Sequence, residues 1–127
     1  MILGIGLDLC EIRRIHEAIQ RPRFLERFYT GAERARILSA SEARRGEIAA
    51  GLFAAKEAVA KALGTGFDGF GPESIETVPD EAGRPTCTLH KGALERAAQL
   101  SGGTFSIYVS ITHEKGMAAA VAVVEES

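Results

Sequence analysis

The order of the predicted elements favours an α+β fold for this sequence, on three observations. An apolar strand pattern covers residues 2–7, helical periodicity dominates residues 11–63, and alternating strand patterns fill residues 105–124. With 127 residues, the chain is long enough to bury a core and short enough for one domain, residues 1–127. We therefore expect a single compact α+β unit without a separate binding module.

Composition and charge narrow the possible functions. The 15 Lys and Arg residues against 17 Asp and Glu residues give a formal net charge of −2, which offers no general attraction for nucleic acid. The N-terminal region lacks the basic and long apolar segments of a signal peptide or membrane span, so we expect a cytoplasmic protein. Cys10 and Cys87 lack metal-ligand spacing and lie in apolar stretches, which favours reduced core thiols over a disulfide.

The first strand and helix flank an acidic residue. We predict a strand over residues 2–7 that ends at Asp8, and an amphipathic helix over residues 11–20, where isoleucines recur at helical spacing. Asp at a strand-to-helix junction is a favoured N-cap. Asp8 is thus open to two interpretations, as a cap of that helix or as a functional carboxylate.

Two further helices are predicted in the first half of the chain. Thr30 and Glu33 have the spacing of a capping box, which favours a structural role for Glu33 before a helix through residue 38. The next helix is expected over residues 47–63, with Gly64 as its C-terminal stop. Its predicted buried stripe consists of Leu52, Ala55, Val59, Ala62 and Leu63.

Glu57 and Lys61 lie one turn apart on that helix, on the side away from the stripe. Taken alone, they match an exposed i,i+4 salt bridge worth about 0.2–0.5 kcal/mol. However, Asp8 and Glu57 both have apolar or small neighbours in the sequence, where a lone carboxylate is costly. Two carboxylates and a lysine together suit a divalent cation that carries a phosphate ester. The glycine-rich residues 64–71 match neither a Walker loop nor a dinucleotide fingerprint.

The second half of the chain alternates strands with one helix. The predicted strands cover residues 75–79, 85–89, 105–112 and 117–124, and the helix covers residues 93–100. The last strand is apolar on both faces, so it needs a helix, a second sheet or another subunit over each side. His113 follows the third of these strands and is open to a surface role or a ligand-binding role.

Four segments resemble, in order, the motifs of holo-acyl-carrier-protein synthases, the small 4'-phosphopantetheinyl transferases. They are residues 4–15, 29–33, 53–66 and 110–113. The resemblance implies a 4'-phosphopantetheinyl transferase-like fold, a small antiparallel sheet packed with helices, in a homotrimer with active sites between subunits. It implies a Mg²⁺-dependent enzyme of fatty acid biosynthesis. Such an enzyme transfers 4'-phosphopantetheine from coenzyme A to a serine of apo-acyl carrier protein and releases adenosine 3',5'-bisphosphate.

The resemblance also implies roles for individual residues. Asp8 and Glu57 would bind Mg²⁺ on the pyrophosphate of coenzyme A, and Lys61 would meet phosphate charge. Glu57 is the candidate general base, directly or through water, with Asp8 as the alternative. Arg14 and Arg21 would contact the acidic carrier protein, where Arg pairs well with carboxylates. The implied coenzyme A contacts are Lys61, Gly64, Gly83, Arg84, Pro85, Thr112 and His113, with the adenine at residues 83–85 and the 3'-phosphate at His113.

Three residues depart from the family pattern. Leu52 stands where the family commonly has Arg, Thr112 replaces a usual Ser, and Met117 replaces a frequent Tyr. With leucine at this position, we expect either weaker binding of the donor or another cation, Lys56 or Arg84, in place of the arginine. A rival interpretation is a coenzyme A or carrier-protein binding module without turnover. A third is a structural assembly protein, in which Glu57 and Lys61 form a salt bridge and Asp8 is a cap.

Overall fold

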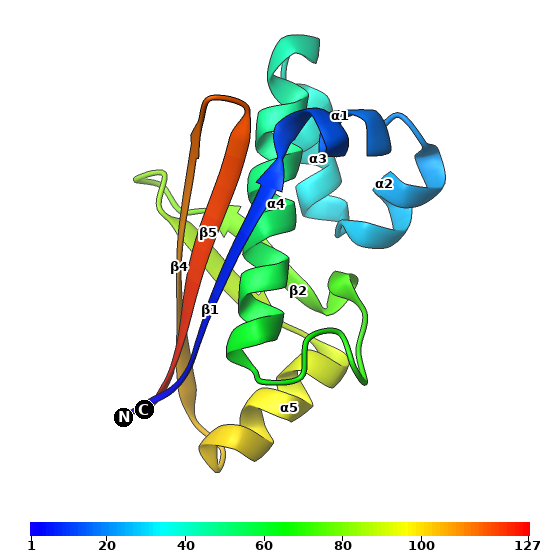
Figure 1. Cartoon of the computed structure of the whole chain (residues 1–127). Helices are drawn as coiled ribbons and strands as arrows, with labels where there is room; N and C mark the ends of the chain where they lie inside the picture. Colours follow the sequence, from blue (N-terminus) through cyan, green and yellow to red (C-terminus); the bar gives the residue numbers. More distant parts are fainter.

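The computed structural model of the chain describes all residues from Met1 to Ser127 and consists of a sheet layer and a helical layer (Figure 1). In chain order the elements are β1 (Ile2–Glu11), α1 (Ile12–Ala18), α2 (Pro22–Phe28), α3 (Gly31–Ser39), α4 (Glu42–Ala62), η1 (Pro72–Ser74), β2 (Ile75–Pro79), β3 (Pro85–Leu89), α5 (Lys91–Ser101), β4 (Phe105–Glu114) and β5 (Met117–Glu126). The predicted α+β class and antiparallel sheet are confirmed.

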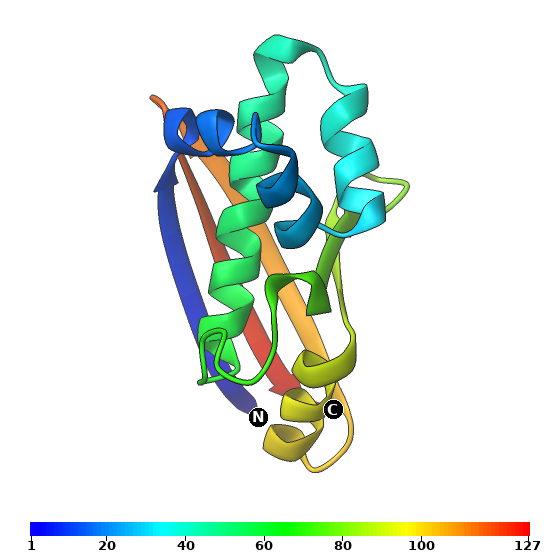
Figure 2. The same cartoon turned by 90° about the vertical axis from the view of Figure 1, so that its right-hand side faces the viewer.

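The main sheet has three antiparallel strands in the order β1-β5-β4, and β2 and β3 form a separate hairpin that packs beside β4. Asp8 of β1 lies opposite Ala120 of β5, and His113 of β4 lies opposite Ala118. Seen from its helical side in Figure 2, the sheet is covered by α4, which runs along it. The small side chains of β5 on this face are buried, so the helix lies close to the sheet.

Close contact between β1 and α4 depends on two glycines. A Cβ atom on Gly6 would lie 1.7 Å from the carbonyl oxygen of Ala58, and one on Gly4 would lie 1.8 Å from that of Ala62. Only glycine allows this approach. The approach places β1, and with it Asp8, directly against α4.

Several predicted elements are confirmed, some with different ends. The hairpin strands β2 and β3 have the predicted bounds, and the capping box of Thr30 and Glu33 is present. Helix α4 begins at Glu42, five residues before its predicted start at residue 47, and α2 was not predicted. The N-terminal proline of α2, Pro22, is the local signal that could have revealed this helix.

The position of Asp8 corrects the sequence prediction. Strand β1 continues to Glu11, so Asp8 lies within the strand and not at its end. The N-cap of α1 is Glu11, which makes no side-chain capping bond. The helix-cap interpretation of Asp8 is therefore wrong, and its side chain points from the strand towards α4, where it meets Lys61.

Both cysteines are free thiols, as predicted. Cys10 donates a hydrogen bond to the carbonyl of Ala50 at 3.5 Å, and burial together with the charge of Asp8 raises its pKa to about 11. A thiol with such a pKa is protonated at neutral pH, which fits a core role. Among the helices, none combines the length and apolar character needed to cross a bilayer.

Candidate active site

Asp8 and Lys61 form the centre of the candidate site. The Nζ atom of Lys61 lies 3.2 Å from Oδ1 of Asp8 and donates a hydrogen bond to the carbonyl of Leu7 at 3.0 Å. The side chain of Asp8 is only 15% exposed, whereas that of Lys61 is 52% exposed. The pair therefore joins β1 to α4 and keeps a positive charge at the surface beside a partly buried carboxylate.

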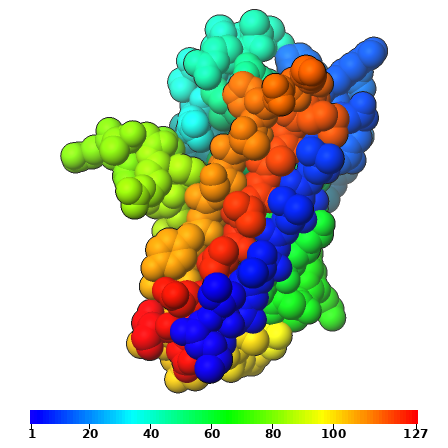
Figure 3. All heavy atoms as spheres, turned by 60° about the vertical axis from the view of Figure 1, so that its left-hand side comes forward, coloured from blue at the N-terminus to red at the C-terminus, as the bar shows by residue number.

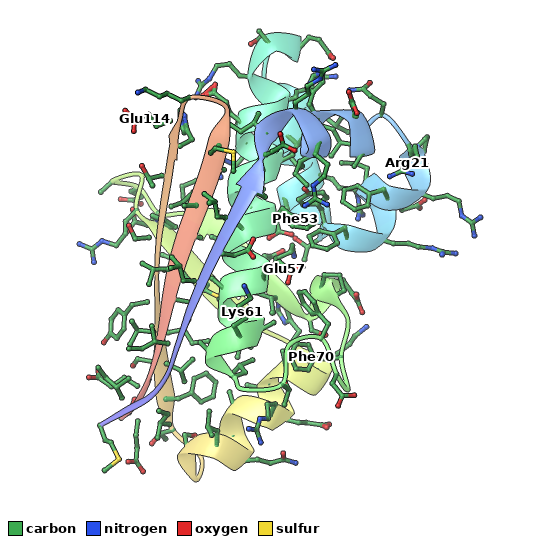
Figure 4. The ribbon with its side chains drawn as sticks, viewed as in Figure 1. Arg21, Phe53, Glu57, Lys61, Phe70 and Glu114 are labelled. Carbon is green, nitrogen blue, oxygen red and sulfur yellow. The ribbon has the colours of Figure 1, made fainter.

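Glu57 lies one turn before Lys61 on α4, and Figure 4 shows Phe53, Glu57 and Lys61 on successive turns of this helix. Glu57 forms no ion pair with Lys61, so the i,i+4 salt bridge considered from the sequence is not formed. Burial and then the charge of Asp8 raise the pKa of Glu57, against the opposite effects of Lys61 and Arg14. The half-buried Glu57 carboxylate is thus repelled by the charge of Asp8 and has no ion-pair partner of its own.

The two carboxylates fit a cation that takes the rest of its ligands from elsewhere. Oδ2 of Asp8 is buried without a hydrogen-bond partner, which is costly unless something binds it. No group of three or more His, Cys, Asp or Glu side chains is arranged to hold a metal ion. Mg²⁺ commonly takes one or two protein carboxylates and completes its shell with phosphate oxygens and water. Asp8 and Glu57 match that requirement better than they match a site built from protein ligands alone.

Lys56, the neighbour of Glu57, points into the protein. Its Nζ atom lies 2.7 Å from Oε1 of Glu33, and both side chains have no exposed surface. Lys56 also donates to the carbonyls of Pro72 and Ile75, and Glu33 accepts from the backbone of Thr77. Burial lowers the pKa of Lys56, while the Glu33 charge acts in the opposite direction. Lys56 is therefore committed to the core, and the expectation that it could replace a ligand-binding arginine at Leu52 is wrong.

A second feature is a cleft of about 220 Å³, which we call the α3–β4 cleft. It is lined by Arg36, Arg44, Glu47, Ile48, Gly51, Leu52, Pro79, Gly83, Pro85, Ile111 and His113. Nδ1 of His113 lies 3.3 Å from Oε1 of Glu47. Leu52 is 1% exposed and contributes an apolar floor.

Some of the predicted coenzyme A contacts line the α3–β4 cleft. Gly83, Pro85 and His113 line it, whereas Arg84 is exposed in the β2–β3 turn outside the lining. Thr112 lies on the opposite face of β4, because successive strand residues alternate. Gly64 lies beyond the C-terminal end of α4, with a φ of 83°, where it stops the helix as predicted.

Arg36, Arg44 and Glu47 were missed by sequence reasoning. In the sequence, each of these residues has the pattern of an exposed polar residue on an amphipathic helix. Arg36 comes from α3, while Arg44 and Glu47 come from the first turns of α4. No local pattern reveals that these residues share a cleft with the end of β4, since only the packing of α3 and α4 brings them together.

The carboxylate pair and the α3–β4 cleft lie on opposite flanks of α4. At about 100° per residue, Glu57 is roughly 180° from Ile48 and roughly 140° from Leu52 around the helix axis. Asp8 lies on β1 and His113 on β4, the two edge strands of the main sheet. One chain alone therefore does not bring all of the predicted site residues together.

Arg14 and Arg21 lie along a groove formed by α1, α2 and α4, together with Phe24 and Phe53. The guanidinium of Arg14 stands 5.5 Å from the ring centroid of Phe53, a cation–π contact. Arg21 also borders a larger groove along α2 that contains Arg23 and Arg27. The two predicted carrier-protein contacts thus share one basic and aromatic surface, which includes Phe53, one turn before Glu57 on α4.

The family model described as the 4'-phosphopantetheinyl transferase superfamily matches residues 4–122. The chain belongs to this superfamily. It is 50% identical over 128 residues to a holo-[acyl-carrier-protein] synthase of Solidesulfovibrio magneticus, covering 98% of this chain and 99% of the relative. A synthase of the same name from Clostridium novyi is 44% identical over 126 residues, covering 98% of this chain and 88% of the relative.

Solved structures of phosphopantetheinyl transferases share the fold of this family member. The holo-(acyl-carrier-protein) synthase of Bacillus anthracis in complex with CoA (3',5'-ADP) has a TM-score of 0.84 and 34% identity, covering 100% of this chain and 99% of that chain. The Helicobacter pylori holo-[acyl-carrier-protein] synthase in complex with coenzyme A has a TM-score of 0.79 and 32% identity, covering 95% and 99%. The predicted family and fold are thereby confirmed.

Proposed function

We propose that this chain transfers the 4'-phosphopantetheine group from coenzyme A to a serine of apo-acyl carrier protein, as a holo-[acyl-carrier-protein] synthase. The observation that carries the proposal is the 50% identity to a synthase over 98% of the chain, with Asp8, Glu57 and Lys61 all present. In the proposed reaction, the serine oxygen bonds to the phosphorus that bears the pantetheine arm. The bond from that phosphorus to the bridging pyrophosphate oxygen breaks, and adenosine 3',5'-bisphosphate leaves with its electron pair. We place this reaction in the cytoplasm, in carrier activation for fatty acid biosynthesis.

Asp8 and Glu57 would hold Mg²⁺ in this enzyme. The unpartnered Oδ2 of Asp8 and the mutual repulsion of the two carboxylates support this assignment. When bound, Mg²⁺ supplies positive charge that neutralises the pyrophosphate and the charge developing on the leaving group. Lys61, held in place by Asp8 and the carbonyl of Leu7, would direct its ammonium group towards the same phosphate charge.

Glu57 is the stronger candidate for the general base. The carboxylate of Asp8 is already paired with the ammonium group of Lys61, whereas Glu57 has no ion-pair partner. The raised pKa of Glu57 makes its carboxylate a better proton acceptor than an ordinary glutamate. Glu57 would take the serine proton directly or through a water molecule, and Asp8 would serve the cation.

The α3–β4 cleft would receive the nucleotide half of coenzyme A. Gly83, Arg84 and Pro85 would border the adenine, and His113 would face the 3'-phosphate. Oε1 of Glu47 lies 3.3 Å from Nδ1 of His113, which leaves Nε2 on the other side of the ring for a ligand. Thr112 and Gly64 are predicted contacts that lie outside the lining of this cleft in one chain.

A homotrimer with active sites between subunits would unite the two parts of the site. In one chain, the carboxylates and the cleft occupy opposite flanks of α4, so a neighbouring copy is required to bring a cleft to the carboxylates. Figure 3 shows the outer face of the main sheet, where β1, β5 and β4 lie side by side without a covering helix. On this face Ile5, Leu7 and Leu9 are each more than 60% exposed. Such an apolar sheet face needs cover, which other copies of the chain would supply.

The basic groove around Arg14 and Arg21 would bind the acidic carrier protein. Arginine suits this role, because its guanidinium pairs with carboxylates through two parallel hydrogen bonds. The groove lies next to Phe53, one turn before Glu57 on α4. A carrier bound there would have its serine within reach of the carboxylates.

The proposal is tested by incubating the purified protein with coenzyme A, MgCl₂ and apo-acyl carrier protein and measuring the intact mass of the carrier. The expected result is the added mass of phosphopantetheine, with release of one adenosine 3',5'-bisphosphate per carrier. Binding of coenzyme A without any mass gain on several carriers would overturn the proposal and support a binding module without turnover.

A further inference from the structure

The hairpin of β2 and β3 forms one wall of the α3–β4 cleft. Pro79, Gly83 and Pro85 line the cleft from this hairpin, and the other lining residues come from α3, α4 and β4. The turn of the hairpin is braced internally, because Oδ1 of Asp80 accepts from two backbone N–H groups of the turn. The shape of the wall is thus fixed within the hairpin, whereas its distance from the helices depends on where the hairpin is anchored.

Apolar packing anchors only the base of the hairpin. Ile75 and Thr77 of β2 and Leu89 of β3 are buried, whereas no residue from 78 to 88 is buried. The hairpin also forms a sheet of its own, so β2 has no neighbouring strand on the edge that faces away from β3. The backbone groups on such an edge need side chains or water as partners.

Glu33 and Lys56 occupy the place of that missing strand. Lys56 donates to the carbonyl of Ile75, and Oε2 of Glu33 accepts from the backbone N–H of Thr77 at 2.9 Å. These two backbone groups belong to alternate residues and therefore point to the same edge of β2. The two side chains lie 2.7 Å apart as an ion pair, and neither has exposed surface. A buried charged pair thus completes the free edge of β2, as the backbone of a further strand would.

The same pair joins the hairpin to both helices of the cleft. Glu33 lies in the first turn of α3 and Lys56 lies in α4, and both helices contribute lining residues. Lys56 also donates to the carbonyl of Pro72 at 2.8 Å, and Thr30, the N-cap of α3, donates to the carboxylate of Glu76. Hydrogen bonds to charged groups are stronger than neutral ones. A shift of the hairpin away from the helices would break several of them at once.

We propose that Glu33 and Lys56 are positioning residues, which hold the hairpin wall of the α3–β4 cleft at the separation that the donor nucleotide requires. This inference rests on the proposed transfer function, in which the nucleotide half of coenzyme A occupies the cleft. Without the pair, the hairpin would sample other positions, and the apparent affinity would fall with the fraction of molecules whose cleft is correctly open. Glu33 then has two roles, since Oε1 serves the cap of α3 and the ion pair, while Oε2 serves the hairpin.

The binding test uses the double variant Glu33→Leu/Lys56→Met, which removes both charges together. Replacement of a buried ion pair by apolar side chains of similar volume is often neutral for stability, whereas removal of one partner is not. The Kd for adenosine 3',5'-bisphosphate, measured by calorimetric titration, should rise by about threefold or more, as for a residue that influences a site without touching its ligand. Thr86→Val is the matched control, because Thr86 donates only to Val78 within the hairpin and its loss should leave the Kd unchanged.

Steady-state kinetics separate positioning from a general loss of stability. In the double variant, the KM for coenzyme A should rise by about the same factor as the Kd. The kcat and the Mg²⁺ concentration for half-maximal rate should stay within about twofold, because the ion pair contacts neither Asp8 nor Lys61. A lower kcat with an unchanged KM would overturn the assignment.

Hydrogen exchange gives a readout that needs neither turnover nor nucleotide. The backbone amides of residues 76–88 should exchange faster in the double variant, whereas those of β5 should keep their wild-type rates. Should the double variant not fold, Glu33→Gln takes its place, since it keeps the size of the side chain and one acceptor oxygen, and its effects should be smaller but in the same direction.

A folded double variant with the wild-type Kd, or with equally faster exchange in the hairpin and in β5, would overturn the assignment. A wild-type protein that does not bind the bisphosphate would overturn it as well. Failure of the wild type to modify a carrier would overturn the transfer function alone, because neither the titration nor the exchange measurement includes a carrier.

Discussion

Lys61 pairs with Asp8, 53 residues away in the sequence, and not with Glu57 on the preceding turn of its own helix. This contact links α4 to β1 at 3.2 Å and leaves the second carboxylate without a direct cationic partner. Because Glu57 still experiences the charge of Asp8, its pKa is raised. The two acids therefore differ in their surroundings, since Asp8 has an ion-pair partner and Glu57 has none.

Asp8→Asn and Glu57→Gln should both impair transfer, for different reasons. Loss of a general base typically costs about 10²–10⁴-fold, so Glu57→Gln should lower kcat by that order at saturating Mg²⁺. Both variants should raise the Mg²⁺ concentration needed for half-maximal rate, because each removes a charged ligand, but Asp8→Asn should keep more of its kcat at saturating Mg²⁺. Initial rates measured across a Mg²⁺ titration check both effects, with Glu95→Gln on exposed α5 as control. A Glu57→Gln variant with wild-type kcat would exclude Glu57 as the base.

The stability of the metal-free protein should depend on pH through Glu57. Its raised pKa means that the folded state favours the protonated acid. The associated stability is full below the ordinary pKa of 4.5 and is lost as the pH rises through the higher folded value. Glu57→Gln mimics the protonated form, so in EDTA it should be more stable than the wild type at pH 7 and should approach it near pH 4. Urea unfolding at a series of pH values measures this difference, and a variant that is less stable at pH 7 would contradict it.

Replacing Lys56 with Met should destabilise the fold strongly. The change leaves the fully buried Glu33 carboxylate without its cation, and breaking a buried ion pair costs about 3–5 kcal/mol. Lys61→Met is the matched control, because its ion pair is half exposed and should contribute about 0–1 kcal/mol. Urea unfolding gives both values. Equal, small losses in the two variants would show that the Lys56–Glu33 pair does not stabilise the fold.

Gly6→Ala should disrupt the contact between β1 and α4. The added methyl group would lie 1.7 Å from the carbonyl oxygen of Ala58, so the strand or the helix must move. Overpacking of this kind typically costs about 1–3 kcal/mol. Gly31→Ala is the control, since its nearest neighbour would be the Arg34 side chain at 3.8 Å. Thermal unfolding should separate the two variants, and an unchanged Tm for Gly6→Ala would contradict the packing described.

Leu7→Lys tests the proposed trimer. Leu7 is 65% exposed on the outer face of the sheet, so one chain should tolerate lysine there, whereas a subunit interface should not. Sedimentation equilibrium should give three times the 13.5 kDa chain mass for the wild type and a single chain mass for the variant. Leu38→Lys changes a leucine that is 49% exposed on α3, outside this face, and should remain trimeric. A monomeric wild type, or a trimeric Leu7→Lys variant, would contradict the interface.

Local patterns account for much of the fold. The alternation in β4, the turn between β2 and β3, and the Thr30–Glu33 capping box depend on short-range geometry, and the structure contains each of them. The end of β1 is not a local property. Residues 8–11 continue the strand because β5 offers hydrogen-bond partners as far as Met117, and this pairing overrides the predicted end at Asp8.

The candidate site was only partly accessible to sequence reasoning. Asp8, Glu57 and Lys61 could be singled out as acids and a lysine among small neighbours, but their pairing was not predictable. The helical spacing of Glu57 and Lys61 suggests a salt bridge, whereas the close approach of β1 allows Asp8 to take Lys61 instead. Arg36 and Arg44 carry no local signal, because their shared cleft exists only after α3 and α4 have packed.

The most direct test of the central claim is the intact mass of apo-acyl carrier protein after incubation with coenzyme A and Mg²⁺. The wild-type protein should add one phosphopantetheine group to each carrier. The Asp8→Asn/Glu57→Gln double variant, matched in concentration and confirmed to be folded, should leave the carrier mass unchanged. A carrier that gains no mass with the wild type, or that gains it equally with the double variant, would contradict transfer by these two carboxylates.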